Sequence, residues 1–455
     1  MTAAVTGWTQ RLRRTMSGNG LRATIARASV AAVILKVLNT VLGFATTVVL
    51  ARALGPDSLG VYAFALAVVM VVGLPAKAGV PQLVTRETAK GKATGEWGTI
   101  KAVWRWSTLV VLGVSAAVLL LALVAALVYP DYFRSEAGTT LAIGLLMIPL
   151  MGLALVRASS LRGLGHIVQG QLPELAIKPL VFLALLLGLL LVSSGTLTAS
   201  WAMTLNIAAT VTAFVVGAWM LRRVRPPAVT MSRPAYESRA WLGSVIPLAT
   251  ITAMHLVNTQ ADLILVGIFM ESADVGNYKI AAQIAFVVGF GLHATKMVAE
   301  PFFARFYRQK DEERLRKLGN GISAANTIIA LSIFLILLIS GKQFIQLVFG
   351  EAFLPAHGPL LVLSAAWVVA AVFSASGQFL VMAGFENKYV WVRVFSVLVN
   401  IVLNLLMIPL FGLMGAAVAT LVSMVIFYIM GWRLAVKETG IDFSAISLVK
   451  PRRRV

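Results

Sequence analysis

The residues of this chain that could do chemistry are mostly bases set inside long apolar segments. Twelve ionisable groups fall within or just inside such segments: Lys36, Arg52, Lys77, Arg157, Lys178, His255, Asp262, Lys279, His293, Lys296, Glu300 and Arg393. A charged group at the centre of a membrane helix costs about 2.5–3.5 kcal/mol, so each needs a partner, a water-filled cavity or a route to the interface. Bases around such a cavity would bind an anion, and arginine can hold a phosphate group through two parallel hydrogen bonds.

Some of these bases have a simpler explanation than ligand binding. Snorkelling explains those within two turns of the cytoplasmic boundary, which are Arg157, Lys178, Lys296 and Arg393. Arg52 lies near the outer end of its segment, where it could equally cap that helix. Lys36 lies two turns inside, and Lys77 and His293 occupy equivalent positions in a repeat, so these three favour cavity lining. We expect an anionic-substrate site that draws on Lys36, Arg52, Lys77, Arg157, Lys178 and His293.

A second candidate site surrounds Asp262, the one acid well inside an apolar segment. Asn258 lies one turn earlier on the same helix face, and Asn400 and Asn404 share a face of a later segment, followed by Thr420 in the last one. Together these oxygen-bearing groups could bind a coupling cation, Na⁺ or H⁺. Alternatively, Asp262 pairs with a nearby base and the asparagines hydrogen-bond helices together.

The composition is that of an integral membrane protein. Of 455 residues, 59% are hydrophobic and only 13% are charged, against about 25% in ordinary globular domains, and the mean hydropathy is +0.88. The 39 Lys plus Arg against 18 Asp plus Glu give a net charge of +21, which indicates basic cytoplasmic loops and not a nucleic-acid partner. No cysteine is present and the four histidines form no ligand-like pair, so we expect neither a metal site nor a cofactor.

Windows of about 20 apolar residues predict twelve membrane-spanning helices. They lie near residues 29–54, 59–80, 103–128, 139–158, 173–193, 199–221, 242–268, 275–298, 321–341, 358–383, 389–410 and 413–434. Basic residues gather in the N-terminal segment, the even-numbered loops and the C-terminal tail, which predicts that both termini are cytoplasmic. The outward loops are too short to form a catalytic domain.

The two halves of the chain repeat each other. A shift of 216 residues places Leu59-Gly60-Val61-Tyr62 on Val275-Gly276-Asn277-Tyr278, and Lys77 on His293. Six spans in each half give both halves the same orientation, so we expect two pseudo-symmetric six-helix lobes around a central cavity. The expected organisation is a basic segment (1–28), an N-lobe (29–225), a cytoplasmic linker (226–240), a C-lobe (241–436) and a basic tail (437–455).

Two motifs in the corresponding spans resemble a known family. The segment at 49–63, Val-Leu-Ala-Arg-Ala-Leu-Gly-Pro-Asp-Ser-Leu-Gly-Val-Tyr-Ala, is similar to the first hairpin of the Wzx-type polysaccharide-unit flippases. The pattern of Asn400, Asn404, Pro409 and Gly412, with Gly-Ala-Ala-Val-Ala-Thr at 415–420, resembles their last two helices. These flippases belong to the multidrug/oligosaccharidyl-lipid/polysaccharide exporter superfamily, and the resemblance covers about residues 25–435.

The resemblance implies a function without covalent chemistry, and therefore no enzyme. Such a flippase moves undecaprenyl-pyrophosphate-linked oligosaccharide units across the bacterial cytoplasmic membrane, for O-antigen, capsule or exopolysaccharide synthesis. A pyrophosphate carries about two negative charges and would match a cationic cavity. The implied partners are the lipid-linked oligosaccharide, membrane lipids, a coupling Na⁺ or H⁺, and other polysaccharide-assembly proteins.

Two other functions are open. A cation-coupled multidrug exporter of the same fold would require Asp262 or Glu300 and tolerate loss of the bases, but the sequence is poor in membrane-embedded acids. A polysaccharide polymerase or ligase would need reactive groups on its outward loops. The longest of these, 129–138 and 349–359, offer only Asp131, Arg134, Glu136, Glu351 and His357.

Overall fold

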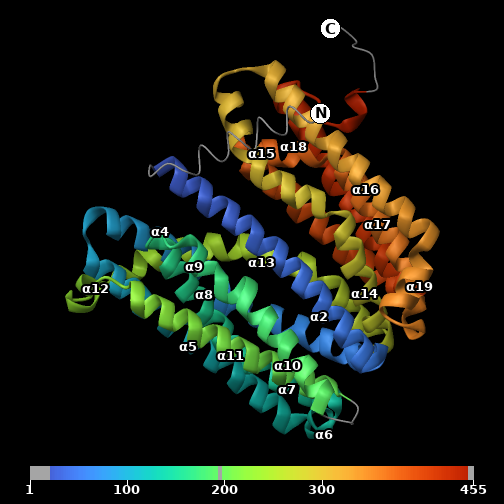
Figure 1. The fold of residues 1–455 in the computed structure, drawn as a ribbon, viewed down its shortest axis with the longest axis horizontal. Coiled ribbons are helices and arrows are strands. Elements are labelled where there is room, and N and C mark those ends of the chain that lie inside the picture. The colour runs from blue at the N-terminus through green and yellow to red at the C-terminus, as the bar shows by residue number, and fades with distance from the viewer. Residues whose placement is uncertain (1–20, 193–196, 449–455) are drawn as a thin grey trace. The chain divides into compact units, whose positions relative to one another are not determined.

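A computed structural model of the protein describes residues 21–192 and 197–448 (Figure 1). Within those ranges the side chains of residues 21–29, 247, 251, 255, 257, 258, 297, 298 and 448 are not described. Every regular element in the described part of the chain is a helix. The all-helical membrane class predicted from the sequence is confirmed. Most of the predicted basic N-terminal segment and the end of the basic tail lie outside the described residues.

Within residues 21–192 and 197–448, eight helices are long and apolar enough to cross a membrane, and up to ten if two bent pairs each count as one span. The bent pairs are Ser238–Met254 with Thr259–Phe269, and Ser272–Val288 with Phe290–Lys296. The predicted number of twelve spans therefore stays a prediction.

The two longest helices are broken at glycines. Helix α2 (Leu21–Val72) breaks at Gly55, where φ is +71°, and helix α19 (Glu386–Thr439) breaks at Gly412, where φ is +57°. Side-chain-bearing residues rarely adopt positive φ, so glycine is what permits each break. The break at Gly55, followed by Pro56, is the tight turn that the sequence predicts between the first two spans.

The contacts of the chain define two compact units. Unit 1 contains the residues up to 49 and 69–253, and unit 2 contains 50–68 and 254–455, so that α2 and α13 (Ser238–Phe269) contribute to both. Unit 1 also contains α3 (Leu74–Lys77), α4 (Val80–Thr94), α5 (Trp97–Val128), α6 (Pro130–Arg134), α7 (Glu136–Leu145), α8 (Met147–Gly163), α9 (Ile167–Leu172), the π-helix η1 (Pro173–Ile177), α10 (Lys178–Val192), α11 (Ala199–Val224) and α12 (Pro227–Met231). The expected lobes, 29–225 and 241–436, stay a prediction.

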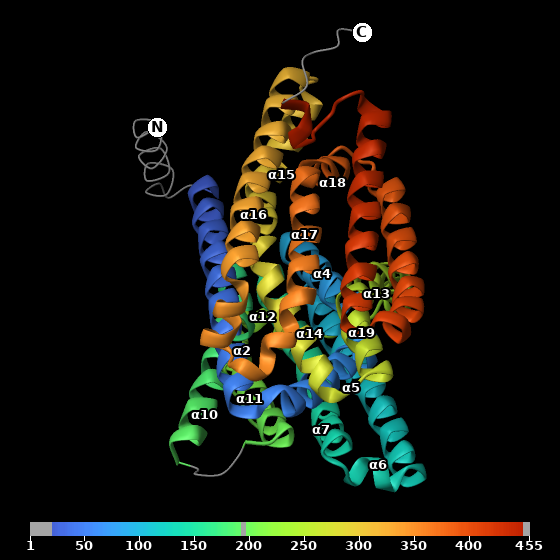
Figure 2. The same cartoon turned by 90° about the vertical axis from the view of Figure 1, so that its right-hand side faces the viewer.

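Unit 2 is organised around α17 (His357–Val372), which packs against α14 (Ser272–Val288), α16 (Glu312–Val348) and α19 (Figure 2). Its other elements are α15 (Phe290–Arg308), η2 (Glu351–Ala356), α18 (Ser374–Met382) and η3 (Ala445–Leu448). In unit 1 the corresponding central helix is α8, which packs against α4, α5 and α11 around the buried side chains of Val80, Val84, Val111 and Val156.

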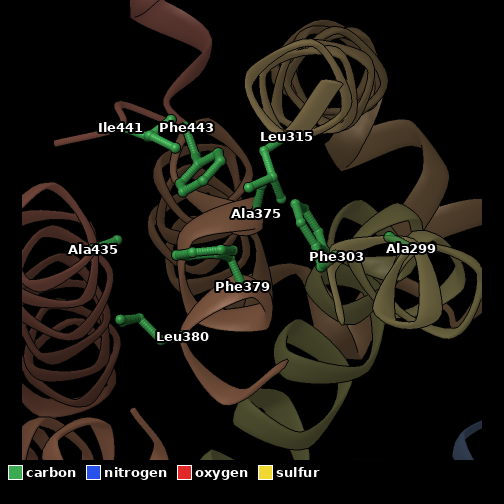
Figure 3. Packing of buried hydrophobic residues seen from close by; sticks show 9 residues of the cluster. All are labelled: Ala299, Phe303, Leu315, Ala375, Phe379, Leu380, Ala435, Ile441 and Phe443. Carbon is green, nitrogen blue, oxygen red and sulfur yellow. The ribbon is translucent and has the colours of Figure 1, made fainter. Parts of the chain in front are cut away.

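At one end of unit 2, aromatic side chains from three separate segments lie in a fully buried cluster (Figure 3). Phe303 of α15 and Phe379 of α18 contact Phe443, whose ring centroid lies 4.6 Å from that of Phe379 and 6.1 Å from that of Phe303. Phe443 follows α19 after the left-handed Gly440 and also packs over Gly319 of α16. The segment after α19 therefore joins three helices that are distant in sequence.

Repeat-equivalent glycines meet inside unit 2. A Cβ atom at Gly60 would lie only 3.0 Å from the backbone nitrogen of Gly276, and one at Gly276 would lie 3.0 Å from the carbonyl carbon of Pro56. Small residues allow membrane helices to approach backbone to backbone and gain dispersion energy. The glycines at 60 and 276 are therefore required by close packing and not by backbone conformation.

A second pair of equivalent glycines breaks helices in the same way. Gly73 ends α2 with φ −76° and ψ 0°, and Gly289 ends α14 with φ −81° and ψ −4°. The helix beyond Gly289 is bent by 48° relative to α14. Lys77 and His293 each follow four residues after their glycine, so each break places a titratable group one turn further along the chain.

We predict that Gly276→Val lowers the melting temperature of the detergent-purified protein, because overpacking a close contact costs about 1–3 kcal/mol. Size-exclusion chromatography after heating measures the change. The matched control is Gly43→Val in α2, where a Cβ atom would meet nothing within 4 Å. Equal melting temperatures for Gly276→Val and the unmodified protein would contradict the packing argument.

Candidate functional site

Unit 2 contains a cavity of about 480 Å³ between α13, α14, α15, α17 and α19. Its polar and charged lining comes from Thr259, Gln260, Asp262, Tyr278, Lys279, Gln283, His293, Arg393, Ser396, Asn400, Thr420, Ser423 and Tyr428. Both halves of the broken α19 contribute, because Arg393 and Asn400 precede Gly412 and Thr420 follows it. A cavity with this many polar groups inside a helical membrane protein is a candidate for ligand binding.

One wall of the cavity carries the Asp262 cluster, in which a carboxylate accepts three hydrogen bonds from neutral donors. Thr420 donates its hydroxyl at 2.6 Å and Tyr278 donates its hydroxyl at 3.2 Å, both to Oδ2. Asn404 donates Nδ2 to Oδ1 at 2.8 Å. Asp262 is half-buried, and a carboxylate partly removed from water is costly unless hydrogen bonds satisfy it, so these donors stabilise Asp262 inside the unit.

The predicted cation-site residues are largely brought together. Asn404 also donates to the carbonyl oxygen of Asn400 at 2.9 Å, and the Nδ2 atom of Asn400 lies 3.3 Å from the hydroxyl of Ser423. Asp262, Asn400, Asn404 and Thr420 therefore share one hydrogen-bonded network. The side chain of the remaining predicted member, Asn258, lies outside the described residues.

The cavity also contains bases and aromatic rings. The guanidinium of Arg393 stacks over the ring of Phe427, with its Cζ atom 4.1 Å from the ring centroid. The imidazole of His293 lies between Phe286 and Trp367, at centroid distances of 5.2 Å and 5.9 Å. Lys279 of α14 completes the cationic lining.

The glycine at the bend, Gly289, packs directly against one of these rings. A Cβ atom at that position would overlap the indole of Trp367 from α17. The glycine that breaks the helix therefore also makes room for the aromatic wall of the cavity.

Three of the other predicted cationic residues lie in unit 1. Lys77 is half-buried and donates to the carbonyl oxygen of Met70 at 3.3 Å. Arg157 donates to the carbonyl oxygen of Phe214 and stacks over that ring at 3.6 Å, so its guanidinium is already engaged by the protein. Lys178, at the start of α10, interacts electrostatically with Lys77 and with Glu174 of the π-helix η1.

The remaining two predicted bases are exposed. Lys36 is exposed on the part of α2 that belongs to unit 1. Arg52 is an exposed residue of unit 2 that donates to the carbonyl oxygens of Leu347 and Val348 at the C-terminal end of α16. A cation there complements the negative end of the helix dipole. Arg52 thus caps a helix, although the capped helix is α16 and not its own.

Sequence reasoning missed Lys279 as a member of the site and assigned Arg393 to snorkelling. A signal for Lys279 was present in the repeat, because the equivalent position in the first half is Ala63, so the two halves differ there by a charge. Tyr278 was not assigned to the site from the sequence, whereas its hydroxyl hydrogen-bonds Asp262. No comparable sequence signal distinguishes Arg393 from the other bases near that boundary.

Comparison with protein families identifies the class of the chain. Residues 49–358 match the model of the family described as polysaccharide biosynthesis protein, and the chain belongs to that family. Two curated relatives come from Haloferax volcanii. The "probable low-salt glycan biosynthesis flippase Agl15" is 23% identical over 88% of this chain and 81% of its own length. The "probable flippase AglR" is 25% identical over 90% and 83%.

Solved structures share the fold. An inward-facing multidrug resistance MATE family transporter of the MOP superfamily superposes with a TM-score of 0.74 at 13% identity, covering 93% of this chain and all of that one. The lipid II flippase MurJ, in an inward closed conformation, gives a TM-score of 0.68 at 12% identity, covering 90% and 87%. The predicted resemblance to flippases of the multidrug/oligosaccharidyl-lipid/polysaccharide exporter superfamily is confirmed.

We predict that Thr420→Val lowers the stability of the purified protein by about 1–3 kcal/mol, because it removes the shortest hydrogen bond to a buried carboxylate. Thermal unfolding in detergent measures the loss. Thr420→Ser retains the hydroxyl and should unfold close to the unmodified temperature. If the valine and serine variants unfold at the same temperature, the hydrogen bond contributes nothing to stability.

Proposed function

We propose that this chain is a flippase for polyprenyl-pyrophosphate-linked oligosaccharide units in the cytoplasmic membrane, serving the assembly of a surface polysaccharide. The observation that carries the proposal is the family match over residues 49–358 in a chain whose apolar helices enclose a polar cavity with bases. The probable flippases among its relatives support the same activity. The reaction moves a molecule between leaflets and makes or breaks no covalent bond, so the protein is not an enzyme.

The proposed architecture has twelve spans in two six-helix lobes, with both termini cytoplasmic. Dividing α2 at Gly55 and α19 at Gly412 adds two spans to the ten obtained when each bent pair counts as one. The lobes would rock between inward-open and outward-open states while the polyprenyl tail stays in lipid. Glycine-broken helices in equivalent positions, at Gly73 and Gly289, support this mechanism because such breaks mark binding regions in transporters.

The proposed substrate contacts are cationic. Each of the bases predicted from the sequence, Lys36, Arg52, Lys77, Arg157, Lys178 and His293, would attract a pyrophosphate group by its positive charge. Among these bases, Lys77 and Lys178 interact electrostatically within unit 1, so an anion near both would be attracted by two charges.

The proposed coupling site is the Asp262 cluster. Its carboxylate, two asparagine side chains and the Thr420 hydroxyl supply the oxygen ligands that Na⁺ or H⁺ requires. Movement of the cation down its gradient would drive the substrate outward.

We predict that depletion of this protein causes sugar-bearing polyprenyl pyrophosphate to accumulate in the cytoplasmic leaflet, with loss of a surface polysaccharide. Extraction of lipid-linked saccharides after leaflet-selective labelling measures the accumulation. Normal lipid-linked pools together with new sensitivity to cationic dyes would contradict the flippase and favour a multidrug exporter.

Rescue of the depleted cells tests the cationic residues. Lys36→Ala and Lys77→Ala should fail to restore export at normal protein level. Lys90→Ala changes an exposed lysine of unit 1 and should restore it. Full rescue by both of the first two variants would exclude these lysines from substrate binding.

We predict that Asp262→Asn uncouples transport from the ion gradient, because the neutral amide removes the charge that binds the cation. Flipping by the variant in proteoliposomes should be unaffected by ionophores that collapse the Na⁺ and H⁺ gradients, whereas flipping by the unmodified protein should fall. If both proteins depend equally on the gradient, Asp262 is not the coupling residue.

A further inference from the structure

The cavity of unit 2 has an unequal distribution of charge, which the proposed coupling site does not explain. The titratable and charged side chains that face it are Asp262, Tyr278, Lys279, His293, Arg393 and Tyr428. Two of these, Lys279 and Arg393, are basic side chains, and Asp262 is the one carboxylic acid among them.

The single acid does not neutralise either base. All three hydrogen bonds that Asp262 accepts come from neutral groups, the hydroxyls of Thr420 and Tyr278 and the amide of Asn404. Among the described residues, no carboxylate oxygen lies within 4 Å of the Lys279 ammonium or the Arg393 guanidinium, although ion pairs do form elsewhere in unit 2.

The two bases are also without hydrogen-bond acceptors in the described part of the chain. The Arg393 guanidinium stacks on Phe427 through its face, and stacking leaves its N–H donors in the plane unused. The Lys279 side chain lines the cavity, and its ammonium donates to no carbonyl or hydroxyl oxygen of the described residues. Both side chains are half-buried, and a partly desolvated cation without an acceptor carries a free-energy penalty that an anionic ligand would reduce.

The charge of the cavity depends on whether a cation occupies the Asp262 cluster. If both bases are protonated and the carboxylate is ionised with no cation bound, the charges of Lys279, Arg393 and Asp262 add up to one positive charge. A Na⁺ ion or a proton at Asp262 raises the sum to two, which matches a group with about two negative charges, such as a pyrophosphate diester. Both sites border one cavity of about 480 Å³, so the cation and the anion would be separated by little protein and would attract each other.

We propose that the unit 2 cavity is an anion-binding site, formed by Lys279 and Arg393, whose affinity is controlled by neutralisation of Asp262. The ligand chemistry is a phosphate, pyrophosphate or carboxylate group, contributed either by the lipid carrier or by an acidic sugar. The inference deepens the proposed function, because it makes cation and substrate bind cooperatively in one unit. Because linkage is reciprocal, bound anion must also raise the affinity for the cation.

The test is direct anion binding by the full chain in nanodiscs, measured by titration calorimetry with inorganic pyrophosphate and, separately, with glucuronate. Each titration is done in choline chloride and in NaCl at the same ionic strength. Lys279→Gln and Arg393→Gln should each weaken binding about tenfold or more, whereas Lys342→Gln, which alters an exposed lysine of α16 outside the cavity, should not change it. Preference for pyrophosphate assigns the anion to the carrier, and preference for glucuronate assigns it to an acidic sugar.

Asp262→Asn tests the control of affinity, because its neutral amide imitates a carboxylate whose charge has been cancelled. The variant should bind the anion about 5- to 150-fold more tightly than the unmodified protein in choline chloride and should not respond to Na⁺. If the unmodified protein tightens in NaCl, Na⁺ is the cation. If it does not, while Asp262→Asn still binds tightly, the cation is a proton.

The unfolding temperature of each variant distinguishes loss of anion binding from poor folding. Without anion, Lys279→Met should unfold at the same or a higher temperature than the unmodified protein, because it removes an unpartnered charge. With pyrophosphate or glucuronate, the unmodified protein should be stabilised and the variant should not. The proposal is overturned if the unmodified protein binds neither probe, if the Lys279 and Arg393 variants bind as it does, or if Asp262→Asn binds no more tightly.

Failure of this proposal is distinguishable from failure of the proposed function. Export in depleted cells that are rescued by the unmodified gene reports the flippase activity alone. If export is normal while Lys279→Gln and Arg393→Gln retain full anion affinity, only the anion site is wrong. If the lipid-linked pools never depend on the protein while the anion site behaves as described, the anion site stands and the flippase assignment falls.

Discussion

The need to satisfy one carboxylate inside an apolar helix bundle governs the arrangement of unit 2. Asp262 can remain there only because hydroxyl and amide donors reach it from α14 and from both halves of α19. Those donors lie on separate helices, so the helices must keep their register for the carboxylate to stay hydrogen-bonded. A movement that displaced the second half of α19 would remove the Thr420 hydroxyl and leave a buried charge poorly compensated.

Glycine makes this convergence possible in two different ways. At Gly412 a positive φ breaks α19, so that Asn404 and Thr420 can approach Asp262 from two directions. At Gly60 and Gly276 the backbone is helical, and the missing side chain instead allows two helices to touch. The first kind of glycine fixes where the chain turns and the second fixes how closely its segments pack, and the Asp262 cluster depends on both.

The sequence predicted the helical membrane class, the family and much of the Asp262 cluster, because apolar length and intramembrane polar residues are strong signals. Asn404 and Thr420 could be placed with Asp262 since each was the conspicuous polar group of its span. The bases were harder to assign. Lys279, Arg393 and Arg52 are all bases in apolar helices, yet two line a cavity and one caps α16. The role of each base depends on contacts with residues distant in sequence, such as that between Arg52 and Val348. The hydrophobic periodicity of a single helix contains no information about such contacts.

The aromatic cluster around Phe443 has a consequence for how the protein is made. Phe443 is completely buried against α15, α16 and α18, which precede it by 60 to 150 residues, about a fifth of a minute of translation at ordinary rates. While the ribosome is still extending α19, Phe303 and Phe379 lack the ring of Phe443 that packs against both of them. Unit 2 can therefore finish packing only after nearly its whole length has been synthesised, and a nascent chain that stalls before Phe443 would present exposed aromatic surface to the quality-control machinery of the cell.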